Sequence, residues 1–339
     1  MHVPLDTSMD LDDFDYELPK EQIAQHAITP KDHSRLMVLH DGVIEHRHFY
    51  EISHFLEPGD TLVVNQAKVE RARIIGRKST GAKVDILLMQ AYDAERFLCK
   101  IKSSGKVVGR DVLFRDGFRC RVESQEDDNY VVCFNKGITP ELREQLFQLP
   151  TPPYIKERLK ADEEYQTVYA TRNGSLAAPT AGLHFTDELL ERIRGMGVSI
   201  VPICLDVGFG TFAPVRAGIH EHTMHEETFS ISEDAAGTIN ARKGRLVCVG
   251  TTTVRALESA CVDGMIQAGE RATSIFIYPG YTWRCSIDAL ITNFHLPRST
   301  LLMLVSAFYG REQILDAYRD AVGRGYRFFS LGDAMLLIK

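Results

Sequence analysis

Apolar and polar residues follow two different rhythms along this chain of 339 residues. In the second half, short apolar runs alternate with stretches in which apolar residues recur at helical spacing. The apolar runs, which are predicted strands, lie at residues 198–205, 246–250, 274–278, 287–292 and 328–338. The predicted helices lie at residues 187–193, 251–267 and 299–322. Because buried strands that alternate with helices are typical of α/β proteins, we expect a layered α/β domain with a largely parallel sheet.

The first half of the chain shows shorter periods. Residues 34–40 and 43–49 predict a hairpin that turns at Asp41-Gly42, and residues 61–65 predict a further strand. Beyond these, short predicted strands with Gly-containing turns lie at residues 72–77, 83–90, 97–101, 107–114, 119–123 and 130–134, before a short helix at 140–148. Such spacing is typical of a small antiparallel barrel or sandwich. We therefore expect a discontinuous α/β domain of residues 1–68 and 152–339, into which residues 69–151 insert as a small β-barrel.

The composition is that of an ordinary soluble protein, with 25% charged and 44% hydrophobic residues. The longest apolar run, Leu301 to Phe308, is too short to span a membrane. Met1 to Asp15 is acidic and lacks the apolar segment of a signal peptide. The seven cysteines include no C-x-x-C pair, so we expect reduced thiols rather than disulfides or a zinc site. These observations predict a cytoplasmic protein that does not enter a membrane.

The charge of the chain is unevenly distributed. The net charge is −7, but the stretch from Lys68 to Arg121 contains fourteen Lys and Arg against six Asp and Glu. This local charge of +8 leaves −15 for the rest of the chain. A basic module on an acidic body favours contact with nucleic acid, although a solvated cationic face of a small β-domain explains the charge equally well.

The stretch from Leu176 to Ile193 joins an irregular segment to a helix start. Thr186 is a suitable N-cap for the apolar residues that follow at helical spacing. The segment before it has neither strand nor helix periodicity and contains Thr180, Gly182 and His184. Such a segment at a helix N-terminus is typical of a site that brings backbone close to a ligand.

Two turns that follow predicted strands carry further candidate chemistry. The turn D-V-G-F-G at 206–210 is similar to the adenosylmethionine-binding turn of common methyltransferases, in which a carboxylate such as Asp206 holds a ribose hydroxyl. The second turn combines Thr251 and Thr252 at a helix start with Arg255. Free N–H groups and a guanidinium can bind a carboxylate or a phosphate there, but helix capping by threonine explains this pattern equally well.

Two segments with histidines complete the candidates. His220 to Glu227 has neither the H-E-x-x-H spacing nor a neighbouring cysteine, so it favours acid or base chemistry by His225 or Glu226 over metal binding. Asn293 and His295 alternate at the end of a predicted strand, where α/β proteins contact ligands. A purely structural role is the more common explanation for such a pair.

The order of the motifs along the chain resembles that of one family. The motifs are A-A-P-T-A-G-L-H-F-T at 177–186, V-G-x-G-T-F at 207–212, M-H-x-E at 224–227, V-G-T-T-T-V-R at 249–255, I-F-I-Y-P-G-Y at 275–281, L-I-T-N-F-H-L-P at 290–297 and Y-R-F-F-S-x-G-D-A-M at 326–335. With F-D-Y-E-L-P at 14–19, they make nearly the whole chain similar to the S-adenosylmethionine:tRNA ribosyltransferase-isomerase family of queuosine biosynthesis.

This resemblance implies an α/β domain with an inserted β-barrel, and it implies a reaction. The ribosyl part of S-adenosylmethionine is transferred to the aminomethyl group of a deazaguanine at the wobble position of tRNA and isomerised to an epoxycyclopentanediol, with release of adenine and methionine. S-adenosylmethionine is then the co-substrate and the tRNA anticodon stem-loop is the partner. We expect no metal, because the sulfonium already acidifies the neighbouring C5′ protons.

The resemblance also implies a role for each candidate residue. We expect proton transfer by His184, His225, Glu226 or His295. We expect S-adenosylmethionine to contact Thr180, Gly182, Asp206, Gly208, Gly210, Thr251, Thr252, Arg255 and Asn293. We expect tRNA to contact Lys68, Arg71, Arg73, Arg77 and Lys78 in the basic module.

Two departures from the family pattern leave alternatives open. Where the family usually has N-x-T-R-V, this chain has N-Q-A-K-V at 65–69, which replaces a hydroxyl by Ala67 and a forked guanidinium by Lys68. Where the family usually has H-V-G-x-G-T-F, this chain has the carboxylate of Asp206. The alternatives are a paralogue that uses another acceptor, including methyl transfer, and a tRNA-binding protein without catalysis.

Overall fold

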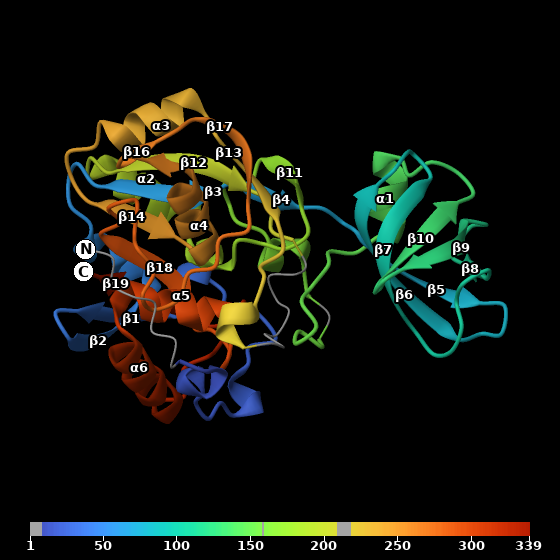
Figure 1. The fold of residues 1–339 in the computed structure, drawn as a ribbon, viewed down its shortest axis with the longest axis horizontal. Coiled ribbons are helices and arrows are strands. Elements are labelled where there is room, and N and C mark those ends of the chain that lie inside the picture. Colours follow the sequence, from blue (N-terminus) through green and yellow to red (C-terminus); the bar gives the residue numbers. More distant parts are fainter. Residues whose placement is uncertain (1–8, 158, 209–217) are drawn as a thin grey trace. The chain divides into compact units, whose positions relative to one another are not determined.

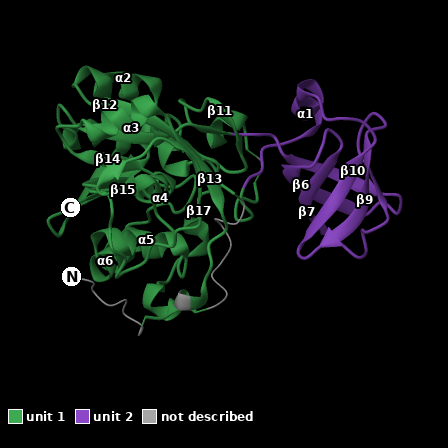
Figure 2. Ribbon diagram, turned by 45° about the horizontal axis from the view of Figure 1, so that its top comes forward, with its two compact units in different colours: residues 1–68, 152–339 green, residues 69–151 purple. Residues whose placement is uncertain are grey.

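The computed structural model describes residues 9–157, 159–208 and 218–339, except for the side chain of residue 220. The chain divides into two compact units, which Figure 2 distinguishes by colour. Unit 1 contains Met1–Lys68 and Pro152–Lys339, and unit 2 contains Val69–Thr151.

A nine-stranded sheet forms the middle layer of unit 1, in the order β17-β13-β12-β3-β14-β18-β19-β1-β2 across the described residues (Figure 1). Its strands in chain order are β1 (Arg35–His40), β2 (Val43–His48), β3 (Thr61–Asn65), β12 (Ser199–Leu205), β13 (Glu227–Ile231), β14 (Leu246–Val249), β17 (Gly269–Thr273), β18 (Ala289–Asn293) and β19 (Ala334–Ile338). In the described residues, β12–β3, β3–β14, β14–β18 and β19–β1 are parallel, and the other four pairs are antiparallel. The predicted α/β class is confirmed, and its sheet is mixed because the antiparallel pairs β12–β13, β13–β17, β18–β19 and β1–β2 lie beside the parallel centre.

Helices cover both faces of this sheet, which explains why its central strands are apolar throughout. Leu246 and Cys248 of β14 enter one core cluster, whereas Val247 and Val249 enter the other. The first cluster includes residues of α3 (Glu233–Asn240), α4 (Thr251–Ala260), α5 (Thr300–Tyr309) and α6 (Arg311–Gly323). The second includes residues of α2 (Asp187–Gly195) and of the 3-10 helix η4 (Phe49–Phe55).

Three predicted elements of unit 1 were wrong in their extent. The long helix predicted at 299–322 is two helices, because Gly310 between them has φ 118. The helix predicted to reach residue 267 ends at Ala260, because Asp263 and Gly264 (φ 49 and 78) turn the chain into the hairpin of β15 (Cys261–Val262) and β16 (Met265–Ile266). The strand predicted at 274–278 is irregular, and the Ile275 carbonyl there accepts a hydrogen bond from a side chain rather than from a strand.

Unit 2 contains a closed barrel in the order β10-β7-β6-β5-β8-β9, which confirms the predicted barrel (Figure 1). Its elements are β5 (Arg73–Lys78), β6 (Lys83–Ala91), β7 (Arg96–Ser103), β8 (Asp111–Leu113), β9 (Arg119–Glu126), β10 (Asn129–Phe134) and the helix α1 (Pro140–Leu146). Phe118 and Phe134 stack in its interior with ring centroids 5.0 Å apart. Gly76 is required in this interior, because a Cβ atom there would lie 2.6 Å from the ring of Phe114.

Short elements complete the described chain. They are η1 (Leu11–Phe14), η2 (Lys20–Gln22), η3 (Lys31–His33), η5 (Asp162–Tyr165), η6 (Thr180–His184), η8 (Ile219–Glu221) and the paired strands β4 (Ala67–Val69) and β11 (Arg172–Ser175). Among the described residues, we find no helix with the length and apolarity that crossing a membrane requires.

Candidate active site

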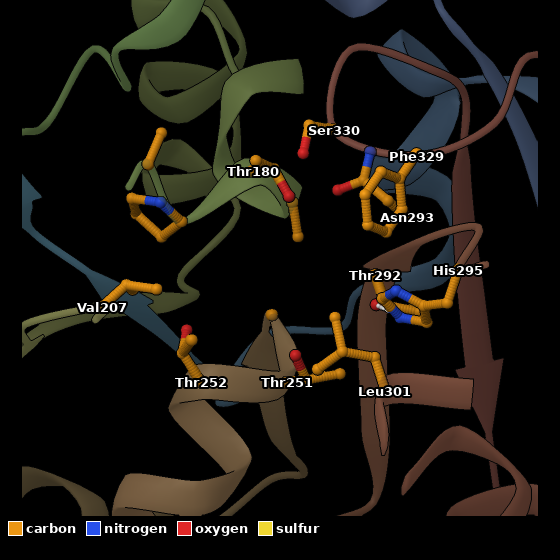
Figure 3. A pocket seen from close by; sticks show the side chains of 14 residues that line it. Thr180, Val207, Thr251, Thr252, Thr292, Asn293, His295, Leu301, Phe329 and Ser330 are labelled. Atoms are coloured by element: carbon orange, nitrogen blue, oxygen red, sulfur yellow. Dashed lines mark hydrogen bonds between the residues drawn. The ribbon is translucent and has the colours of Figure 1, made fainter. Parts of the chain in front are cut away.

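A pocket lies in unit 1 at the carboxyl ends of β14 and β18, and Figure 3 shows its lining. Its empty volume, which includes open solvent at its mouth, is about 470 Å³. Its lining residues come from segments that are distant in the sequence: Ala178, Pro179, Thr180, Ala181, Val207, Gly250, Thr251, Thr252, Thr292, Asn293, His295, Leu301, Phe329 and Ser330. The parallel pairs β12–β3–β14–β18 place the carboxyl ends of these strands at one edge of the sheet. This edge is where open α/β sheets bind ligands.

The N-terminus of α4 forms one wall of the pocket. Gly250 is its N-cap with φ 92, and no side chain caps the helix. The Thr253 hydroxyl donates back to the Val249 carbonyl at 2.7 Å, so it does not cap the helix. Thr252 Oγ1 is buried and has no hydrogen-bond partner in the described residues. The free N–H groups and the helix dipole make this wall electropositive.

The opposite wall carries a buried network around Asn293. His184 Nε2 lies 3.1 Å from Asn293 Nδ2, and His184 Nδ1 lies 2.7 Å from Ser34 Oγ. The His184 ring stacks on Phe49 with centroids 5.0 Å apart. Burial, helped by the positive charges of Arg327 and Lys31, lowers the pKa of His184 to about 3. The imidazole is therefore neutral at physiological pH.

His295 also lines this pocket and is held firmly in place. Its Nε2 lies 2.9 Å from Thr292 Oγ1, its backbone N–H donates to the Tyr318 hydroxyl at 3.0 Å, and its carbonyl accepts from the Tyr16 hydroxyl. Burial lowers the pKa of His295 to about 3. The ring is therefore a neutral group that contacts the pocket.

Phe329, which lines the pocket, has a strained backbone conformation. Phe329 has φ 72, a conformation that costs a non-glycine residue free energy. Its backbone N–H donates to the Phe294 carbonyl at 3.0 Å, and its ring meets Tyr154 edge to face with centroids 4.1 Å apart. Tyr154 also hydrogen-bonds to Ser330. These contacts hold the strained backbone at the pocket.

An ion pair between Glu227 and Arg255 lies behind the α4 wall. Each side chain is only 2% exposed. Arg255 also donates through Nε to the Ile275 carbonyl at 3.2 Å, and Glu227 Oε1 accepts the Gly208 N–H at 3.1 Å. The pair thereby links α4, β13 and the segment after β12. Arg255 does not line the pocket, and its charge is compensated by Glu227.

Several residues predicted to bind S-adenosylmethionine lie outside the pocket lining. A Cβ atom on Gly182 would lie 1.9 Å from Tyr169 Oη, so this glycine allows close packing of η6. Asp206 is partly exposed, and its backbone N–H donates to the Thr228 carbonyl at 2.9 Å. Gly208 donates to Glu227 as described, and Gly210 lies outside the described residues.

Some of the other predicted residues line the pocket, and others do not. Thr180, Thr251, Thr252 and Asn293 line the pocket together with His295. His225 and Glu226 lie on exposed coil before β13. Among the described residues there is no group of three or more His, Cys, Asp or Glu side chains placed to hold a metal ion.

Several residues of this region were not among the predicted site residues, including Glu227, Val207, Phe329 and Ser330. Glu227 had a signal, because it alternates with the apolar residues Phe229 and Ile231 and therefore shares their buried face. The signal for Phe329 and Ser330 was their place in the motif at 326–335, but the positive φ at Phe329 is not encoded by a recognisable local pattern.

The basic side chains of the barrel are arranged by the strand register. Residues on one outer face of β5, β6 and β7 are in register across the three strands, and five of them are basic: Arg73, Arg77, Lys83, Lys100 and Lys102. Asp85 lies among them and forms a two-point ion pair with Arg73. We call these five residues the basic face.

The predicted RNA-binding residues lie partly on this face. Arg73 and Arg77 belong to it, whereas Lys78 donates to the Lys106 carbonyl at 3.3 Å. Arg71 forms an ion pair with Glu144 at 3.1 Å. Lys68 is exposed on β4 in unit 1.

The fold and the pocket define a class of protein, an α/β protein with a pocket at the carboxyl ends of its parallel strands, where such sheets bind small ligands. Comparison with known proteins identifies the family within this class. The chain belongs to the queuosine biosynthesis protein family, whose model matches residues 11–337. This confirms the family resemblance that the sequence motifs indicated.

Individual relatives agree with this assignment. The S-adenosylmethionine:tRNA ribosyltransferase-isomerase of Moorella thermoacetica is 51% identical, covering 97% of this chain and 100% of the relative. The protein of the same name from Thermus thermophilus is 47% identical, covering 97% of this chain and 99% of the relative. The crystal structure of the S-adenosylmethionine tRNA ribosyltransferase from Thermotoga maritima is 36% identical with a TM-score of 0.55, covering 96% of this chain and 100% of that chain.

Proposed function

We propose that this protein is a ribosyltransferase-isomerase of queuosine biosynthesis. It transfers the ribosyl part of S-adenosylmethionine to the aminomethyl group of the deazaguanine at the tRNA wobble position, isomerises it to the epoxycyclopentanediol, and releases adenine and methionine. Relatives about half identical over nearly the whole chain support the proposal through their names. Because tRNA is the acceptor, the proposal places the protein in the cytoplasm.

The observation that carries the proposal is the chemistry of the pocket. Two buried polar atoms in its lining, Thr252 Oγ1 and Asn293 Oδ1, have no partner in the described residues. Buried polar groups without partners are costly, so such atoms favour a polar ligand. Val207, Leu301 and Phe329 add apolar surface that suits a nucleoside. The chemistry of this lining therefore supports binding of a ligand such as S-adenosylmethionine.

The sulfonium of the co-substrate supplies acidified C5′ protons, so the protein must accept one proton and help adenine leave. We assign this proton transfer to His295, which lines the pocket and is neutral at physiological pH. Burial disfavours its imidazolium form, so the ring is a weak base that passes a proton on readily and can take one only from an acidified position such as C5′. His184 is bonded on both ring nitrogens, and His225 and Glu226 are exposed, so these three remain weaker candidates.

The reaction is tested by product analysis. The protein is mixed with S-adenosylmethionine and tRNA that carries the aminomethyl-deazaguanine base, and tRNA without this base is the control. Equal release of adenine and methionine, with a matching mass gain on the modified tRNA only, is the expected result. Adenosylhomocysteine as the product would establish methyl transfer instead. Tight tRNA binding with no product would indicate a tRNA-binding protein without catalysis.

A second experiment tests whether the basic face of the barrel binds tRNA. Phosphate contacts by Lys and Arg make the affinity for nucleic acid fall as salt rises, with a slope of roughly 0.7–0.9 per phosphate neutralised. We expect the triple variant Arg77→Ala, Lys83→Ala, Lys102→Ala to weaken tRNA binding and to reduce this slope by about 2. The control is Arg121→Ala, because Arg121 lies on β9 and pairs with Asp111 at 3.2 Å. An unchanged slope in the triple variant would exclude the basic face from tRNA binding.

A further inference from the structure

The hydrogen bonds around Asn293 fix which way its amide points. Asn293 Nδ2 lies 3.5 Å from the Asp333 carbonyl oxygen, an atom that can only accept a hydrogen bond. The NH₂ group therefore faces Asp333, and Oδ1 faces away from it. The side chain is only 2% exposed, and Oδ1 has no partner in the described residues. Figure 3 shows this oxygen pointing into the pocket.

His184 reinforces the same orientation. Because Asn293 Nδ2 also points at His184 Nε2, that nitrogen must accept, and the ring proton must sit on Nδ1, where Ser34 Oγ takes it. A pKa of about 3 keeps this tautomer neutral at physiological pH, so it cannot become a second donor toward the amide. His184 is thus a positioning residue that acts through Asn293.

The α4 wall has the opposite polarity. α4 has ten residues and no side-chain cap, so its first N–H groups are free to bind a ligand. Thr252 is 8% exposed, and its Oγ1 is the second buried atom in this pocket without a partner in the described residues. Figure 3 shows the hydroxyl oxygen of Thr252 directed toward the same cavity as Asn293. One wall therefore offers donors and positive potential, and the other offers a fixed acceptor.

We propose that these two walls bind the amino-acid end of S-adenosylmethionine, the carboxylate at Thr252 and the α4 N-terminus, and the α-ammonium at Asn293 Oδ1. This inference rests on the proposed function. In S-adenosylmethionine, only this end places an anion and a cationic N–H donor on one carbon. A phosphate of tRNA would satisfy the α4 wall but would leave the Asn293 acceptor unpaired, so the pair of walls favours the zwitterion.

Three ligands test the inference in calorimetry with the full chain. S-adenosylmethionine has the carboxylate and the ammonium, decarboxylated S-adenosylmethionine keeps only the ammonium, and 5′-methylthioadenosine lacks both groups and also the sulfonium charge. We expect the wild-type protein to lose roughly 10-fold or more in affinity at each step, because a hydrogen bond to a charged group is lost each time. Equal affinity for all three would overturn the inference without any variant. Absence of S-adenosylmethionine binding would instead refute the proposed function.

Variants then test which wall of the pocket binds the carboxylate and which binds the ammonium of the ligand. Asn293→Ala and His184→Phe should weaken binding of the two amine-containing ligands roughly 10- to 100-fold and leave 5′-methylthioadenosine unaffected. Thr252→Val should weaken only S-adenosylmethionine, about 10-fold. The matched control is Asn240→Ala, because the Asn240 amide bonds only to the backbone of Ile266 among the hydrogen bonds described.

The ligand pattern separates a positioning role from damage to the fold. A variant with a disturbed pocket loses all three ligands in the same proportion. If Asn293→Ala weakens binding of 5′-methylthioadenosine as strongly as binding of S-adenosylmethionine, then Asn293 does not bind the ammonium group, and the inference is wrong.

Discussion

The buried ion pair of Glu227 and Arg255 allows a quantitative test of how unit 1 is built. Both side chains are 2% exposed, and Glu227 also accepts a hydrogen bond from the Gly208 N–H. Arg255→Met keeps an unbranched apolar stem but removes the guanidinium that pairs with the buried Glu227 carboxylate. Removing one partner of such a pair costs about 3–5 kcal/mol, because the remaining charge is uncompensated.

A double variant separates this pairing from other effects. Glu227→Gln keeps an oxygen that can accept from Gly208, and combined with Arg255→Met it leaves no buried charge. We therefore expect the double variant to be more stable than the sum of the single changes predicts, by about 2 kcal/mol or more. The control is Arg319→Met, because Arg319 pairs with Asp316 on the surface of α6, where an ion pair contributes about 1 kcal/mol or less.

The assay uses the single tryptophan of the chain, Trp283, which lies in unit 1. Its fluorescence during urea denaturation reports the free energy of unfolding of that unit alone. A loss below about 1 kcal/mol in Arg255→Met, or single changes that add without coupling, would refute the reasoning from burial.

Further predictions concern pH, packing and salt. His184 and His295 have pKa values of about 3 in the folded protein, so the unfolded chain binds protons that the folded chain does not. The free energy of unfolding should therefore fall by up to about 2 kcal/mol per histidine as the pH drops from 7 to 5. Replacing either His184 or His295 with Gln should remove about half of the combined loss. A free energy of unfolding that does not change with pH would contradict this. Gly182→Ala should cost about 1–3 kcal/mol because its Cβ would overlap Tyr169, whereas Gly195→Ala, with no atom within 4 Å, should be neutral or stabilising in the same urea titration. The triple variant of the basic face should leave the stability of unit 1 unchanged, which the same fluorescence measurement checks.

Local patterns predicted most of the fold. The Asp41-Gly42 hairpin has positive φ at both turn residues, and Thr186 and Ser299 cap their helices through hydrogen bonds of 3.2 Å to backbone N–H groups. The break at Gly310 was not predictable, because one glycine in a helical pattern does not reveal whether it adopts φ 118. Likewise, the mixed direction of the sheet depends on how distant strands pair, and β18 and β19 carry no local sign of their antiparallel pairing.

The pocket was predictable where strand ends supplied its residues. Asn293 is the last residue of β18, Thr251 and Thr252 lie just beyond the end of β14, and parallel strands bring such ends together. The contact between Ser34 and His184 was not predictable, because it joins residues 150 positions apart and exists only after the sheet and η6 have packed. The sequence therefore indicates which residues can reach a ligand more readily than which residues orient them.

Asp206 decides whether one departure from the family pattern matters. The sequence predicts that this carboxylate holds a ribose hydroxyl, but it lies outside the described pocket lining, and a Cβ atom on Gly174 would lie 3.5 Å from it. We expect Asp206→Asn, which removes the charge and keeps the size, to change the affinity for S-adenosylmethionine by less than about twofold in calorimetry. Asp206→His, which restores the residue usual in the family, should behave in the same way. A loss of 10-fold or more in Asp206→Asn, the effect of removing a hydrogen bond to a charged group, would establish the ribose contact instead.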